Sequence, residues 1–243
     1  MNKERGYLLM ELLKIAESDL HMSGLLYQKG FYAGAVYHLQ QCVEKTAKVE
    51  ALFNNKIQEG ELKKKIGHSS FRIDALNTIN IFKKLPKYNE NDKELKWFKH
   101  LISGKPDKAL LVLSFIPKEK ILHLLNVRPN SSKKLFLRSE DIFNRKINKK
   151  GKVIDLSYEL FVMSLIFSPH AEISRYPNKL LSPLQYNKNL GIVQAFYGLG
   201  KRMSKIWVLL KFMVLKKYPK LRHFDKGDPN VLEFMKNLSE EKK

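Results

Sequence analysis

Apolar residues along most of this chain recur at the three- and four-residue intervals that place them on one face of a helix. The spacing predicts a first helix over about 3–28 and a second over about 31–53, with Lys29-Gly30 between them. Two long helices joined by so short a turn are expected to pack antiparallel. The same spacing predicts a third helix over 71–84.

The most regular pattern lies toward the C-terminal end, over 192–218. Its apolar positions step by four and three: Ile192, Phe196, Leu199, Met203, Ile206, Leu210 and Met213. This predicts a long helix with one apolar stripe facing inward. Lys201, Lys205 and Lys216 fall on the opposite face, so we expect the outward face to be basic.

A further apolar helix is predicted over 155–167, whereas 87–151 holds short amphipathic pieces broken by glycine and proline. The pattern therefore predicts an all-α protein. We expect an antiparallel up-and-down bundle of four to five core helices formed by 1–86 and 152–224. Residues 87–151 are interpreted as a helical insertion or lid, and 225–243 as a C-terminal tail.

The composition narrows the class of protein. The chain has 243 residues, of which 44% are hydrophobic, as expected of a folded protein. The apolar runs fall well short of the ~20 residues that a membrane span needs, and the first residues do not resemble a secretory signal. The single cysteine, Cys42, excludes an intrachain disulfide. These features predict a cytoplasmic protein that does not associate with membranes and carries no metal or cofactor.

The charge is unusual, because 45 Lys and Arg against 24 Asp and Glu give a formal net charge of +21. Such an excess attracts polyanions, although a generally lysine-rich surface is the alternative reading. From 173 to 224 the chain has no acidic residue. It has eleven basic residues there: Arg175, Lys179, Lys188, Lys201, Arg202, Lys205, Lys211, Lys216, Lys217, Lys220 and Arg222. This segment predicts a positive face and a nucleic acid or nucleotide as partner.

Four short motifs occur in a recognisable order. They are Ala16-Glu17-Ser18-Asp19, then Gln40-Gln41 with Glu44-Lys45 and Lys48, then Gly67-His68, then Arg175-Tyr176-Pro177. Their order and helical positions resemble the HEPN family (higher eukaryotes and prokaryotes nucleotide-binding). The resemblance covers roughly 4–85 and 155–218.

The resemblance implies a helical bundle that often forms a homodimer. Members are either RNases, often toxins paired with an antitoxin, or non-catalytic binding proteins. The RNase branch uses a metal-independent mechanism that needs an Arg and a His four to six residues apart on one helix. None of the histidines at positions 21, 38, 68, 100, 123, 170 and 223 has an arginine four to six residues upstream of it.

The chain is therefore expected to be a non-catalytic HEPN-type protein that binds RNA or a nucleotide, in a defence or toxin–antitoxin system. Two alternatives stay open. One is a metal-independent RNase that pairs His68 or His223 with a distant Arg. The other is a scaffold that binds a partner protein.

No catalytic residue is assigned. The candidate binding residues are Gln41, Lys45, Lys48, His68, Arg175, Tyr176, Lys201, Arg202 and Lys205. The first three could line a binding groove or form hydrogen bonds within the bundle. His68 could cap a helix or take part in catalysis.

Arg175 and Tyr176 could hold a phosphate and stack on a base, as single-stranded nucleic acid requires. Alternatively, Arg175 could form a salt bridge across the bundle while Tyr176 packs under its loop. Lys201, Arg202 and Lys205 are candidates for non-specific phosphate contacts.

Overall fold

The computed structural model describes residues 3–61, 70–73, 75–76, 110–125, 156–176 and 181–224. All the regular structure within these ranges is helical, so the predicted all-α class is confirmed. The expected helix over 71–84 is helical at the few positions described, and its remainder lies outside the described residues.

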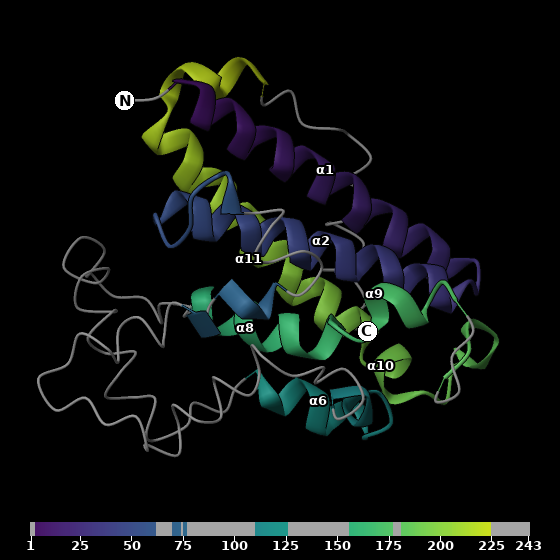
Figure 1. The fold of residues 1–243 in the computed structure, drawn as a ribbon. Helices are drawn as coiled ribbons and strands as arrows, with labels where there is room; N and C mark the ends of the chain where they lie inside the picture. The colour runs from purple at the N-terminus through teal and green to yellow at the C-terminus, as the bar shows by residue number, and fades with distance from the viewer. Residues whose placement is uncertain are drawn as a thin grey trace, which may run out of the picture.

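The first two helices form an antiparallel hairpin (Figure 1). α1 spans Lys3–Gln28 and α2 spans Tyr32–Phe53, within a few residues of the predicted bounds. Gly30 makes the turn with a φ of 82°, a left-handed conformation that costs glycine little. The backbone N–H of Phe31 donates to the carbonyl of Leu26 at 2.9 Å and closes the end of α1.

A third long helix, α11 (Phe196–Lys217), runs alongside this hairpin (Figure 1). The Trp207 indole N–H donates to the backbone carbonyl of Leu13 at 2.9 Å. At the N-terminal end of α11, the Phe196 ring stacks on Tyr27 with centroids 4.3 Å apart. The predicted seam faces inward, because Leu199, Met203, Ile206 and Leu210 are fully buried.

The predicted long helix over 192–218 is divided in two. α10 covers only Gly191–Gln194, and α11 begins after Ala195. Gly191, the first residue of α10, is packed closely against the backbone of Ser114 and Ile116.

Shorter elements complete the described structure. α8 (Leu156–Phe167) packs on α2 and matches the helix predicted over 155–167. The others are η2 (Leu111–Ser114), α6 (Lys118–Leu124), α9 (His170–Ile173), η3 (Pro183–Gln185) and η4 (Pro219–Phe224). Leu111, Ile121 and Leu125 belong to the same core as the hairpin. The division of the chain into a bundle and an insertion or lid stays a prediction.

A fully buried histidine connects three of these shorter segments. His170 Nε2 lies 3.0 Å from the Ser114 hydroxyl, and Nδ1 lies 2.5 Å from the Tyr186 hydroxyl. All three side chains are buried. The sequence pattern did not predict this network, which joins η2, α9 and the loop after η3.

Among the described residues, no helix is both long and apolar enough to cross a membrane.

Candidate functional site

A polar network joins α1 to α2 on the side of the hairpin that carries the first three candidate residues. Asp19 Oδ1 lies 3.0 Å from His38 Nδ1, and Asp19 Oδ2 accepts a hydrogen bond from Lys45 Nζ at 2.7 Å. Burial of Asp19 opposes ionisation, but the hydrogen bonds from His38 and Lys45 outweigh burial and lower the carboxyl pKa. Asp19 is therefore an anion at neutral pH.

The network continues along α2. Lys45 also donates to Gln41 Oε1 at 3.0 Å, and Gln41 donates in turn to Gln40 at 2.6 Å. Gln40 donates to Glu44 at 3.2 Å, and Lys48 pairs with Glu44 at 2.6 Å. Gln41, Lys45 and Lys48 thus form hydrogen bonds within the bundle, which is one of the two roles that the sequence left open for them.

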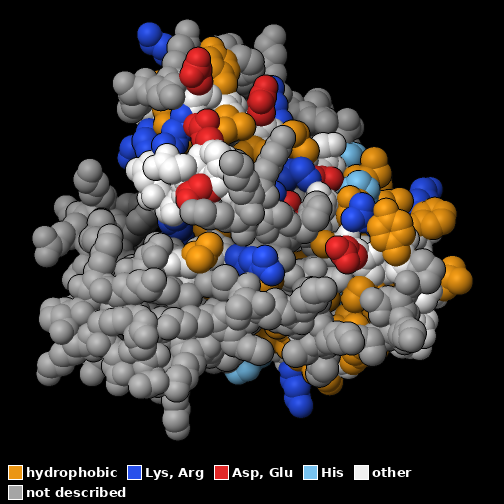
Figure 2. Space-filling model, viewed as in Figure 1, with side chains coloured by type: hydrophobic (Ala, Val, Ile, Leu, Met, Phe, Trp, Pro, Cys, Tyr) orange, Lys and Arg blue, Asp and Glu red, His pale blue; other side chains and the backbone are white. Residues whose placement is uncertain are grey.

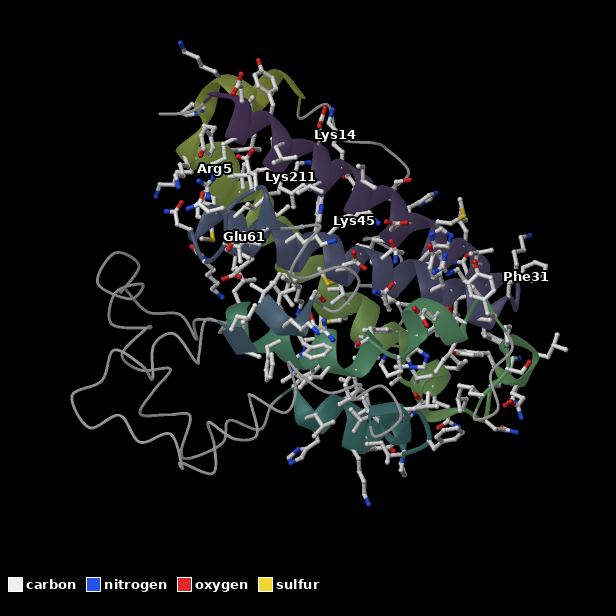
Figure 3. The ribbon with its side chains drawn as sticks, in the orientation of Figure 1. Arg5, Lys14, Phe31, Lys45, Glu61 and Lys211 are labelled. Carbon is white, nitrogen blue, oxygen red and sulfur yellow. The ribbon has the colours of Figure 1, made fainter. Side chains whose placement is uncertain are left out.

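These three residues nevertheless keep part of their surface exposed, and they share a face with Tyr37. Tyr37, Gln41, Lys45 and Lys48 follow one another at intervals of four, four and three, so they form one outward line, here called the α2 stripe. Figure 3 labels Lys45 on α2.

The residues after α9 lie against the start of the α2 stripe. The Arg175 guanidinium lies 4.9 Å from the Tyr37 ring centroid and 5.2 Å from that of Tyr176. Its Nε donates to the Ala171 carbonyl at 3.0 Å. Among the described residues, Arg175 forms no ion pair, and Tyr176 is 61% exposed rather than packed under the loop. Arg175 and Tyr176 thus lie at the start of the α2 stripe, which holds three further candidates.

The α11 candidates lie elsewhere. Arg202 forms an ion pair with Glu159 of α8 at 2.9 Å, so part of its charge is neutralised. Lys201 is half-buried and Lys205 is exposed. His68 lies outside the described residues. The nine candidates therefore do not form one groove within the described structure.

Some of the basic excess stabilises the bundle itself. Arg5 donates to the carbonyl of Leu52, and Lys217 donates to that of Phe53 at 3.4 Å. Both cations are favourably placed at the C-terminus of α2, where the helix dipole is negative. Burial and the charge of Arg5 lower the pKa of Lys217. Over the hairpin, Figure 2 shows Lys and Arg side chains interspersed with Asp and Glu.

Sequence reasoning missed Tyr37, His38 and Asp19 as members of this surface. Asp19 lies on α1, at the end of the first of the four motifs. His38 is on the other helix of the hairpin, and no local signal pairs it with Asp19. Among the described residues, no cluster of three or more His, Cys, Asp or Glu is placed to hold a metal ion.

Comparison with known families agrees with the resemblance read from the motifs. The model of the HEPN domain matches residues 9–97, which include most of α1 and all of α2. This match confirms the predicted resemblance to the HEPN family over residues 9–97. The match ends before α8 and α11, which complete the described bundle. Comparison with curated proteins and with solved structures found no match.

Asp19→Asn is expected to destabilise the fold by about 1–3 kcal/mol, because it leaves the half-buried ammonium of Lys45 without its carboxylate. Urea denaturation at pH 7 measures the change. Glu11→Gln is the matched control, since Glu11 is an exposed carboxylate on the same helix. We expect the control to stay within about 0.5 kcal/mol of wild type. Equal stability of the two variants would show that the network contributes nothing.

Proposed function

We propose that this HEPN-domain protein binds single-stranded RNA without cleaving it, along the α2 stripe and the Arg175-Tyr176 pair. A HEPN domain indicates a function related to RNA or nucleotides. The finer assignment rests on one observation, the exposed cation and aromatic rings at the start of the α2 stripe. As further parts of the proposal, we include a homodimer and a role in defence or in a toxin–antitoxin system.

Single-stranded RNA is recognised by stacking of its unpaired bases and by cations at its phosphates. Tyr176 offers an exposed ring, and the adjacent guanidinium of Arg175 is not neutralised by an ion pair among the described residues. Lys45 and Lys48 extend the surface, but Asp19 and Glu44 already offset their charges. We therefore expect Arg175 to contribute more to affinity than either lysine.

Fluorescence anisotropy with a labelled 12-nucleotide oligouridine tests this proposal. Affinity should fall steadily as salt rises, because phosphate contacts release counterions. Tyr176→Ala should weaken binding by about 1–3 kcal/mol, the usual worth of one base stacked on a ring. Arg175→Gln should weaken binding and also reduce the salt dependence.

Lys188→Gln is the control, since it removes an exposed cation outside the α2 stripe, and its affinity should change little. Binding that does not respond to salt would contradict the proposal. So would unchanged affinity of both the Arg175 and the Tyr176 variants.

RNA cleavage is a second candidate, favoured by the Asp19–His38 contact. A carboxylate 3.0 Å from an imidazole can orient that ring for proton transfer. The centroid of the His38 ring also lies 5.2 Å from that of Tyr37, and the Arg175 guanidinium lies over the Tyr37 ring. We expect labelled RNA to stay intact when it is incubated with the protein. Cleavage that His38→Ala abolishes would establish the RNase instead.

A further inference from the structure

The outward face of α11 is not uniformly basic. Three of its side chains are apolar and exposed: Val208 at 43%, Leu209 at 37% and Phe212 at 63%. They share this face with three lysines, so the outer face of α11 consists of Lys201, Lys205, Val208, Leu209, Phe212 and Lys216. The sequence pattern predicted the lysines but not the apolar residues between them.

The arrangement of this face is specific. Lys205 and Lys216 are eleven residues apart, which is about three turns and about 16 Å along the axis. The two lysines therefore lie at nearly the same angle around the helix. Leu209 and Phe212 lie between them along the axis, one on each side of the line that joins them. The whole of α11, from Phe196 to Lys217, contains no Asp or Glu.

We propose that the outer face of α11 is a docking surface for a partner protein that presents an amphipathic acidic helix. Its apolar side chains would cover Phe212 and Leu209, and carboxylates about three turns apart would meet Lys205 and Lys216. This inference is independent of RNA binding at the α2 stripe. Leu209 and Val208 favour a protein over RNA, because aliphatic side chains offer no ring on which a base can stack.

Two other occupants fit the face less well. A second copy paired in register with this face, parallel or antiparallel, would bring lysines against lysines, and like charges repel. A bilayer would require an apolar centre with lysines at the margins. Here Lys205 and Lys216 lie on the midline of the face, where they would be pressed into the acyl region. An acidic helix resolves both problems because it supplies the opposite charge at those two positions.

The test uses two lactam-stapled helical peptides of about 20 residues, stapled because short helices are marginal alone. The two peptides have the same amino-acid composition, and each has an apolar face of leucines. In the aligned peptide, two Glu residues eleven apart share the leucine face. In the displaced peptide, the same two Glu residues lie on the opposite face. The full-length protein is titrated into each labelled peptide, and anisotropy gives the Kd.

We expect the aligned peptide to bind at least about tenfold more tightly than the displaced peptide. Phe212→Ala should weaken the aligned complex at least about tenfold, and Lys205→Gln by about threefold at low salt. Phe115→Ala and Lys188→Gln are matched controls, because Phe115 is 55% exposed and Lys188 is exposed, both outside α11. Their Kd values should equal that of wild type.

Equal Kd values for the two peptides would overturn the proposal, as would an unchanged Kd for Phe212→Ala. Two further outcomes, one from sedimentation and one from oligouridine anisotropy, count against it. A wild-type dimer that Phe212→Ala converts to a monomer would assign the face to a second copy. Loss of oligouridine binding in Phe212→Ala and Lys205→Gln, with Tyr176→Ala unaffected, would assign it to RNA.

Discussion

Gly191→Ala is expected to destabilise the protein by at least about 3 kcal/mol, at the upper end of what overpacking costs. A Cβ at this position would lie 1.9 Å from the backbone oxygen of Ile116 and 3.1 Å from that of Ser114. Both obstacles are backbone atoms, so no rotamer change can relieve the contact. α10 would have to move away from η2, and with it the start of α11.

Gly200→Ala is the matched control, because it makes the same substitution within α11. An added Cβ at Gly200 meets nothing within 4 Å. Alanine loses less conformational freedom than glycine when a helix forms, so this variant should be more stable than wild type by about 0.5–1 kcal/mol. Urea denaturation of both variants at pH 7 measures the two changes. Similar stabilities for the two alanine variants would contradict the close packing of α10 against η2.

His170→Ala is expected to cost about 2–5 kcal/mol. The substitution removes a fully buried ring and leaves the buried hydroxyls of Ser114 and Tyr186 without their shared partner. Tyr186→Phe removes one hydrogen bond from the same ring and should cost less, about 1–3 kcal/mol. Chemical denaturation gives both values. A His170→Ala variant as stable as wild type would mean that the network does not hold these segments together.

The same histidine should make stability depend on pH. Burial lowers the pKa of His170 to about 3, whereas an unfolded histidine titrates near 6.5. Between these values the unfolded chain binds a proton that the folded chain does not. The contribution of His170 to the free energy of unfolding is therefore fully present above about pH 6.5. It is lost as the pH falls toward 3, by up to about 1.4 kcal/mol per pH unit.

His170→Gln isolates this contribution, because glutamine does not titrate. From pH 7 to pH 5, wild type should lose about 2 kcal/mol more of its unfolding free energy than the glutamine variant. The carboxylates and the other histidines titrate in both proteins, so the difference reports His170 alone. Parallel pH profiles would contradict a neutral, buried imidazole.

The helices of this protein were predictable because their signal is local. An apolar residue every three or four positions places a stripe on one side of a helix regardless of what covers it. That rule located α1, α2, α8 and α11 within a few residues. It failed at Ala195, where the single long helix predicted over 192–218 is interrupted. At Ala195 the chain makes a turn between α10 and α11, and the apolar spacing from Ile192 to Phe196 runs through that turn without a break.

The candidate surface was predictable in part. The motifs selected Gln41, Lys45, Lys48, Arg175 and Tyr176, and the structure places Arg175 against Tyr37, at the start of the α2 stripe that holds the first three. The sequence could not show that Tyr37 connects the two groups. It also could not show that Arg202 would be paired with Glu159. Both contacts join segments that are far apart in the chain, and the periodicity of a sequence carries no information on which segments face each other.

By itself, the sequence determined the helical class, the position of the long helices and the HEPN resemblance over the first hairpin. It also determined the charge, since net charge is a sum over residues that folding leaves unchanged. Only the tertiary structure decided how that charge is used. Cations such as Arg5 and Lys217 stabilise the end of α2, whereas Arg175 and Lys205 remain on the surface. The reason is physical: an ion pair depends on distances across the fold, and those distances exist only once the helices have packed.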